Sequence, residues 1–325
     1  MRVVDIERSR GATPRLRAGL RNAWCVAALC ALTSMLTACS SGGPATAAVS
    51  PLDDDVITVG SFDFAESVVV AEVYSQALEA AGYKVQRAFS LGPREFVGPA
   101  LSAGLVEFVP EYAGTASEFY SLGHAQPTQD VGATHSELVA AVGGDRLIAL
   151  DAAPAQDANT FVVTQATASR LQLQKISDLQ TVAGQLTFGG PPECRTRRLC
   201  LAGLADTYEL TFGDVVTLDA GGPLTHDALK EGVVDVALLF TTDPAIANQG
   251  LVELADDRGL QPAESITPVV RTEVVDHWGS DVVAVINAVS VRLTTDAVRQ
   301  LNGATAPAGT DVAAVASAWW SEVRS

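Results

Sequence analysis

The chain has 325 residues, enough for one large domain or two ordinary ones, and its 48% apolar and 18% charged composition is that of a globular protein. With 21 Lys and Arg against 38 Asp and Glu, the net charge is −17. Because nucleic-acid affinity comes largely from Lys and Arg, this acidity argues against nucleic-acid binding and against adhesion to anionic lipid by charge alone.

The first forty residues predict an export signal. Arg15, Arg17 and Arg21 precede an apolar stretch over residues 23–36 that has the length of a signal-peptide core. The run from Leu36 to Cys39 resembles the bacterial lipobox, in which the cysteine is acylated and becomes the mature N-terminus. An ordinary signal peptide with an incidental cysteine is the alternative. We predict a signal peptide over residues 1–38 and an extracytoplasmic protein lipid-anchored to the cell membrane through Cys39.

Cysteine usage agrees with this processing. Removing the signal peptide deletes six Arg and two acidic residues, which changes the net charge from −17 to −21. Of five cysteines, Cys25 and Cys30 leave with the signal and Cys39 takes the lipid, so Cys194 and Cys200 remain. A pair in an exported protein predicts a disulfide. Metal ligation is the weaker alternative, because no histidine lies nearby, and we predict no metal site and no cofactor.

A flexible tether precedes the folded body. Residues 39–55 show no apolar period and are rich in small residues, which is typical of a coil-like linker. The run Val56–Gly60 then predicts a buried strand, and Val85–Phe89 predicts the next one. Between them lies a helix with apolar residues on one face, and the spacing of Asp63 and Glu66 suits a capping box. Strand, helix and strand at this spacing predict a parallel sheet.

A short internal sequence repeat indicates two similar lobes. Residues 100–107 and 228–235 both read as a helix end, a glycine and a buried strand, although any helix–strand junction has this pattern. Linker-like composition recurs at residues 151–159 and 259–264. We therefore predict lobe 1 from residues 56–158 and 265–325, and lobe 2 from residues 160–262. Two segments crossing between lobes would form a hinge over a ligand cleft.

The usual catalytic signatures are missing from the sequence. There is no G-x-S-x-G, P-loop, H-E-x-x-H or G-x-G-x-x-G motif, and the four histidines are scattered. A Ser/His/Asp triad could still assemble in space. We therefore do not predict an enzyme, and keep a tethered envelope hydrolase as the alternative, together with a sensory or assembly lipoprotein.

Four blocks in consistent order resemble one known family. They are Gly60–Glu66, Leu91–Glu95 with Pro99–Leu101 after it, Glu111–Thr115, and Phe240–Asp243 followed by Leu254–Asp257. These blocks are similar to those of the substrate-binding proteins of osmoprotectant ABC importers, which handle glycine betaine, choline, carnitine or proline betaine. The resemblance covers residues 57–270.

The resemblance implies fold and function together. The expected fold is α/β, the two-lobed periplasmic-binding-protein fold of type II with two crossing segments. The expected function is delivery of a small compatible solute, glycine betaine-like or more apolar, to an ABC permease and its ATPase. The chain is expected to act as a monomer, with no chemistry of its own.

The expected ligand-binding residues follow predicted strands or lie at the first crossing, where open α/β sheets bind their ligands. They are Ser61, Phe62, Asp63, Tyr112, Thr115, Asn159, Phe161, Phe240, Thr241 and Asp243. Several have structural alternatives. Phe62, Phe64 and Phe161 could be core aromatics, Thr115 and Asp243 could cap helices, and Arg94 could bind either a ligand carboxylate or a surface acid.

Departures from the family pattern predict an altered pocket. Phe62 stands where the family commonly has Lys, Val109 replaces a Tyr, and Phe161 and Phe240 stand where Tyr is common. Since Tyr is the better partner for a cation, we expect weak glycine betaine binding and a preference for a larger, flatter or less charged solute.

Overall fold

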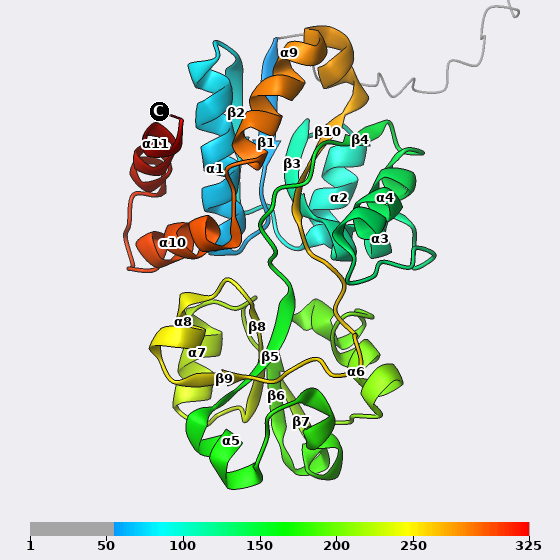
Figure 1. Ribbon diagram of the computed structural model, residues 1–325, viewed down its shortest axis with the longest axis vertical. Helices are drawn as coiled ribbons and strands as arrows, with labels where there is room; N and C mark the ends of the chain where they lie inside the picture. Colours follow the sequence, from blue (N-terminus) through cyan, green and yellow to red (C-terminus); the bar gives the residue numbers. More distant parts are fainter. Residues whose placement is uncertain (1–54, 325) are drawn as a thin grey trace, which may run out of the picture. The chain divides into compact units, whose positions relative to one another are not determined.

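The computed structural model describes residues 55–324, the side chain of Ala247 excepted, and places two five-stranded sheets in that range (Figure 1). The predicted signal peptide, the lipidated Cys39 and all of the tether except Asp55 lie outside the described residues. In the described range, no helix is both long enough and apolar enough to cross a membrane.

The first sheet and its helices are called lobe 1. The strands lie in the order β2-β1-β3-β10-β4. They are β1 (Val56–Gly60), β2 (Lys84–Ala88), β3 (Phe108–Tyr112), β4 (Leu147–Ala149) and β10 (Ile266–Arg271). The helices are α1 (Ala65–Ala80), α2 (Arg94–Ser102), α3 (Ala113–Tyr120), α4 (Val131–Val142), α9 (Thr272–Ser290), α10 (Thr295–Thr305) and α11 (Val312–Val323). One apolar cluster around this sheet forms the core of lobe 1.

The second sheet and its helices are called lobe 2. The strand order is β7-β6-β8-β5-β9. The strands are β5 (Asn159–Thr164), β6 (Thr187–Gly190), β7 (Asp214–Thr217), β8 (Val236–Phe240) and β9 (Leu251–Glu253). The α-helices are α5 (Gln165–Leu171), α6 (Leu201–Tyr208), α7 (Pro223–Lys230) and α8 (Pro244–Asn248). Short 3₁₀ helices cover Ile176–Thr181, Ala183–Gln185 and Pro192–Arg195.

The two sheets share one topology. In each, three neighbouring strands run parallel to one another, β2-β1-β3 in lobe 1 and β7-β6-β8 in lobe 2. One strand, β10 in lobe 1 and β5 in lobe 2, runs antiparallel to both of its neighbours. Each antiparallel strand enters its sheet directly from the other lobe, along segments 150–158 and 254–265. The sheets are therefore mixed rather than purely parallel, because a strand arriving from across the cleft begins at the edge where the parallel strands end.

The two copies of the internal repeat, residues 100–107 and 228–235, occupy equivalent places in the two lobes. Its first copy forms the end of α2 and leads into β3, and its second copy does the same for α7 and β8. Gly104 and Gly232 both adopt left-handed backbone angles, with φ of +73° and +70°, which glycine tolerates without a steric penalty. Consequently Tyr112 and Phe240 stand at the ends of equivalent central strands.

Candidate functional site

A small cavity lies where the strand ends of the two lobes meet. It is lined by residues from both sheets and from both crossing segments, and about 60 Å³ of it is open to water-sized molecules. A space of roughly 10–15 Å³, measured in this way, holds one water molecule. The structure therefore represents a closed arrangement, and a solute of several heavy atoms enters only when the lobes or the lining side chains move.

Four aromatic rings form one wall of the cavity. Phe64 stands in the middle, with ring centroids 5.8 Å from Phe62, 5.7 Å from Tyr112 and 5.3 Å from Phe240. Phe62 and Phe64 follow β1, Tyr112 ends β3, and Phe240 ends β8 in lobe 2. Ring faces of this kind attract cations and pack on apolar groups. We call these four residues the aromatic cluster.

A buried arginine stands beside the aromatic cluster. The guanidinium of Arg94 lies 5.0 Å from the centre of the Phe62 ring, and its Nε and Nη2 donate to Glu111 Oε2 at 3.0 and 2.9 Å. Arg94 is 7% exposed and Glu111 is fully buried. Burial opposes the charge on Arg94, but Glu111 raises the pKa of Arg94 above its ordinary value. A permanent cation thus borders the cavity, with Glu111 holding its orientation.

A second acid reaches the cavity from the crossing segment before β10. Glu264 is 1% exposed and accepts hydrogen bonds from the backbone amides of Gly114 and Thr115, at 2.9 and 2.8 Å, at the start of α3. Burial raises the pKa of Glu264 to about 8, although Arg94 and the two amides favour its ionised form. The Glu264 carboxyl is therefore able to take up or release a proton near neutral pH.

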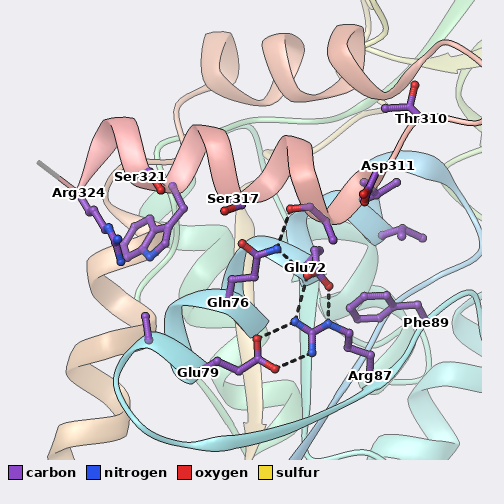
Figure 2. A pocket seen from close by; sticks show the side chains of 15 residues that line it. Glu72, Gln76, Glu79, Arg87, Phe89, Thr310, Asp311, Ser317, Ser321 and Arg324 are labelled. Atoms are coloured by element: carbon purple, nitrogen blue, oxygen red, sulfur yellow. Dashed lines mark hydrogen bonds and ion pairs between the residues drawn. The ribbon is translucent and has the colours of Figure 1, made fainter.

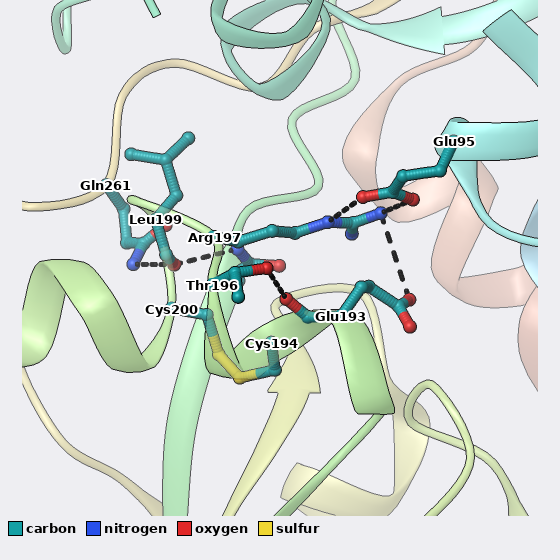
Figure 3. Close-up of a disulfide and its surroundings, with 9 residues drawn as sticks. Glu95, Glu193, Cys194, Thr196, Arg197, Leu199, Cys200 and Gln261 are labelled. Atoms are coloured by element: carbon teal, nitrogen blue, oxygen red, sulfur yellow. Dashed lines mark hydrogen bonds and ion pairs between the residues drawn. A yellow bond between two sulfur atoms is a disulfide. The ribbon is translucent and has the colours of Figure 1, made fainter. Parts of the chain in front are cut away.

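The disulfide-bonded loop of lobe 2 contacts lobe 1. Cys194 and Cys200 are joined, and the segment between them carries Arg197, whose Nη2 lies 2.8 Å from Glu95 Oε2 on α2 (Figure 3). Arg198 forms a second cross-lobe ion pair, 2.8 Å from Glu118 Oε1 on α3. The disulfide closes the loop that presents both arginines. The two arginine side chains are partly exposed, 31% for Arg197 and 55% for Arg198. Exposed ion pairs contribute about 0–1 kcal/mol each, so these contacts join the lobes without preventing their separation.

Comparison with known proteins identifies the family. Residues 55–322 match the family described as the substrate binding domain of ABC-type glycine betaine transport system (OpuAC). The chain belongs to this family. It is a solute-binding protein of an ABC importer and not an enzyme. Family members are extracytoplasmic binding proteins that deliver a small solute to permease components, so the family resemblance read from the sequence is confirmed.

Individual relatives agree with this assignment. The solute-binding protein is 26% identical over 276 residues to the glycine betaine-binding protein YehZ of Escherichia coli (strain K12), covering 80% of this chain and 88% of YehZ. It is 28% identical over 148 residues to the carnitine transport binding protein OpuCC of Listeria monocytogenes serotype 1/2a (strain 10403S), covering 45% and 47%. A crystal structure titled glycine betaine/carnitine/choline ABC transporter matches with a TM-score of 0.65 at 22% identity, covering 82% of this chain and 98% of that one. This structural match confirms the predicted two-lobed type II fold.

The structure brings six of the predicted ligand-binding residues of the solute-binding protein to the cavity. They are Phe62, Asp63, Tyr112, Thr115, Asn159 and Phe240. Asn159 reaches it because β5 runs antiparallel to β8 and begins opposite Phe240 at the cleft edge. The Asn159 side chain then donates to the Leu199 carbonyl at 3.1 Å, which fixes it against the disulfide-bonded loop.

Four predicted residues are not in the cavity lining. Ser61 is fully buried, and its hydroxyl donates to the Phe62 carbonyl and accepts from the Ser90 amide, both at 2.9 Å. Thr241 exchanges two hydrogen bonds with the backbone of Ala158, each at 3.0 Å. Asp243 caps α8, as its structural alternative predicted.

Phe161 also lies away from the cavity. It stands two residues inside β5, opposite Leu238, and its ring packs on Phe188 in the core of lobe 2. Two residues along a strand span about 7 Å. Phe161 therefore lies below the cleft although it is on the same face of β5 as Asn159.

Several lining residues are not among the predicted ligand-binding residues. Phe64 and Arg94 have structural alternatives in the sequence, and Asp157, Arg197 and Glu264 are not predicted as site residues. Asp157 and Glu264 both lie in the linker-like segments at residues 151–159 and 259–264. An acidic side chain in each predicted hinge segment was therefore the available signal, since hinge segments line the cleft.

A larger groove lies on lobe 1 between α1 and α11, with a volume of about 770 Å³ (Figure 2). The polar groups at its floor are already paired: Arg87 donates to Glu72 at 2.6 Å and to Glu79 at 2.7 Å. It lies in lobe 1 alone and shares no residue with the cavity. Within residues 55–324, no group of three or more His, Cys, Asp or Glu is placed to hold a metal ion.

Proposed function

We propose that this solute-binding protein captures a zwitterionic compatible solute that is larger than glycine betaine, and that it does so from a lipid anchor at Cys39. The observation that carries the proposal is the aromatic cluster with Arg94 at its edge. Ring faces suit a quaternary ammonium or other apolar cationic group, each contributing about 0.5–2 kcal/mol. The Arg94 guanidinium suits a carboxylate. Relatives named for glycine betaine and carnitine support this solute class.

Two features favour a solute with more apolar surface than glycine betaine. Three rings of the aromatic cluster are phenylalanines, and the one hydroxyl, on Tyr112, already donates to Glu66 Oε1 at 2.9 Å. The wall therefore offers ring faces and few polar tips. Arg94 supplies the positive charge that the Lys-to-Phe difference at position 62 removes, since it lies over that same ring.

Calorimetry with three solutes tests the proposal. Carnitine is expected to bind more tightly than glycine betaine, and choline, which lacks a carboxylate, more weakly than carnitine. Phe64→Ala is expected to weaken carnitine binding by about 2- to 30-fold, because one ring face is lost. Phe96→Ala is the matched control, since Phe96 is 67% exposed on α2 outside the cavity, and it should leave the affinity unchanged. Equal affinities for Phe64→Ala and the unaltered protein would contradict the proposal.

The lipid anchor has its own test. Cys39→Ser in the full chain is expected to abolish incorporation of a labelled fatty acid and to leave the signal peptide uncleaved by the lipoprotein route. Cys194→Ser is the matched control, because Cys194 is engaged in the disulfide and should not affect labelling. Normal labelling of the Cys39→Ser chain would show that the anchor lies elsewhere. This outcome would leave solute binding untouched.

A further inference from the structure

The carboxylate of Glu66 does not cap helix α1, although its position in the sequence predicts that it does. Glu66 lies in the first turn of α1, where capping-box spacing with Asp63 predicts a bond to the helix start. The capping residue is instead Phe64, with no side-chain cap, so the predicted capping box is wrong. Glu66 is only 5% exposed, and its carboxylate accepts a hydrogen bond from Tyr112, whose ring lines the cavity. Burying a carboxylate is costly unless other groups stabilise it, so Glu66 needs hydrogen-bond donors around it.

Three donors from separate parts of the fold converge on Glu66. Tyr112 Oη, from β3, donates to Oε1 at 2.9 Å, and Asn302 Nδ2, from α10, donates to Oε2 at 2.6 Å. The hydroxyl of Thr242, just after β8 in lobe 2, also bonds Oε2. Burial and the nearby Glu66 raise the pKa of Tyr112 well above its usual value, so Tyr112 stays a donor. Glu66 thus connects a ring of the aromatic cluster to the other lobe.

The same threonine hydroxyl touches a second buried carboxyl group. Thr242 Oγ1 lies 2.8 Å from Asp157 Oδ1, and Asp157 is 4% exposed in the first crossing segment. A hydroxyl carries one hydrogen, so it can donate to only one of the two carboxylates. The other contact is attractive only when that carboxyl group itself carries a proton. The Thr242 backbone amide also donates to Asp157 Oδ1, at 3.1 Å, but it cannot supply a hydrogen to the contact that the hydroxyl leaves without one. One proton shared between Glu66 and Asp157 satisfies both hydroxyl contacts.

The neighbouring charges do not remove this requirement. Arg94 is engaged with Glu111, and Arg299 of α10 pairs with Asp296 and donates to the Thr241 carbonyl. Burial, followed by the charge of Glu66, raises the pKa of Asp157 well above its ordinary value. In the closed arrangement the Glu66–Asp157 pair thus carries a single negative charge.

We propose that Glu66 is a positioning residue for solute binding. Its carboxylate holds the Tyr112 ring in place and shares one proton with Asp157 through the Thr242 hydroxyl. Closing the cleft therefore takes up one proton from the surrounding solution. When the lobes part, the contact between Glu66 and Thr242 breaks and both carboxyl groups meet solvent. At neutral pH an exposed carboxyl group is ionised. The inference rests on the proposed function, because the proton is coupled to the same cleft that takes the solute.

The sign of the effect follows from linkage. The closed form holds one more proton than the open form, so closure and solute affinity are strongest at lower pH. Affinity should fall as pH rises toward the raised pKa of Asp157, by up to about tenfold per pH unit for one full proton. Glu264 also faces the cavity with a pKa of about 8, so its contribution must be measured separately.

Calorimetry in two buffers of different ionisation enthalpy counts the protons taken up when carnitine binds. The unaltered protein is expected to take up a proton, and Asp157→Asn about one fewer, because an amide cannot titrate. The number of protons taken up by Glu264→Gln shows how much of the uptake belongs to Glu264. Tyr112→Phe should weaken binding but keep the proton, since it leaves both carboxyl groups in place. Glu253→Gln is the control: burial raises the pKa of Glu253 too, but it lies outside the cavity.

An infrared difference measurement between the carnitine-bound and the solute-free protein tests the shared proton directly. On carnitine binding at pH 7 the protein should gain a carbonyl band of a protonated carboxyl group, which persists in Glu264→Gln and disappears in Glu264→Gln/Asp157→Asn. Unchanged proton uptake in Asp157→Asn, or persistence of the band in that double variant, would overturn the proposal while leaving solute binding established. Absence of binding by every solute would instead count against the proposed function, on which the proton coupling rests.

Discussion

Replacing Arg94 by methionine is expected to lower the free energy of unfolding by about 3–5 kcal/mol, because it leaves the carboxylate of Glu111 buried without its cation. Glu111 is fully buried, and its Oε2 accepts two hydrogen bonds from the buried Arg94, at 3.0 and 2.9 Å. Urea denaturation at neutral pH measures the change. A loss below 1 kcal/mol would show that Glu111 is protonated or solvated in the native protein.

Two further variants separate charge from packing. Arg94→Met/Glu111→Gln removes both charges and should recover a large part of the loss, since the penalty comes from the unpaired carboxylate. Arg170→Met is the surface control: Arg170 lies 3.7 Å from Asp235 with 59% of its side chain exposed, and its loss should cost less than about 0.5 kcal/mol. If the double variant is no more stable than Arg94→Met, packing of the guanidinium against Phe62 is the larger contribution.

The stability of the protein should decrease as pH rises from about 5 to 8, and Glu264 should account for a distinct part of the decrease. Its pKa is about 8 in the folded protein, against about 4.3 for an unperturbed glutamate. The folded state therefore holds more protons than the unfolded state over this interval. Stability is then highest below the unfolded value and is lost progressively as pH approaches 8, at about 1.4 kcal/mol per pH unit for one proton.

Glu264→Gln should remove this dependence on Glu264, because a glutamine does not titrate and its carbonyl still accepts from the Gly114 or Thr115 amide. The difference in unfolding free energy between the variant and the unaltered protein, measured at pH 5.5, 6.5 and 7.5, should grow in favour of the variant as pH rises. Glu231→Gln, at an exposed position after α7, should show no such trend. Parallel pH profiles for Glu264→Gln and the unaltered protein would place the folded pKa of Glu264 near its ordinary value.

Sequence patterns predicted the parts of the fold that depend on local chemistry. The β1–α1–β2 unit and the glycine-terminated helices before β3 and β8 need only apolar periodicity and a glycine. The direction of β5 and β10 could not be read in this way, because it depends on the lobe from which each strand arrives. Phe161 was misplaced for the same reason, since its depth below the cleft depends on where β5 begins.

The polar part of the site was less predictable than its aromatic part. Tyr112 and Phe240 end strands and Phe62 follows one, and strand ends meet at one edge of a sheet. The roles of Glu66 and Asp157 depend on Thr242, which is 176 residues from Glu66 and 85 from Asp157 along the chain. No local pattern reports such a contact, and at Glu66 the local pattern favoured a helix cap that the tertiary contacts override.

The position of β10 in the lobe 1 sheet constrains the order in which the exported chain can fold. β10 lies between β3 and β4 and pairs Ile266 with Tyr112, so β4 has no other partner in this sheet. All five strands of lobe 2 precede β10 in the chain, so that sheet can form before the C-terminal part becomes available. Lobe 1 can close its sheet only once the chain up to residue 271 is available for pairing. Until then the edge of β3 stays open, which keeps the solute site incomplete and leaves the chain dependent on protection against edge-to-edge association.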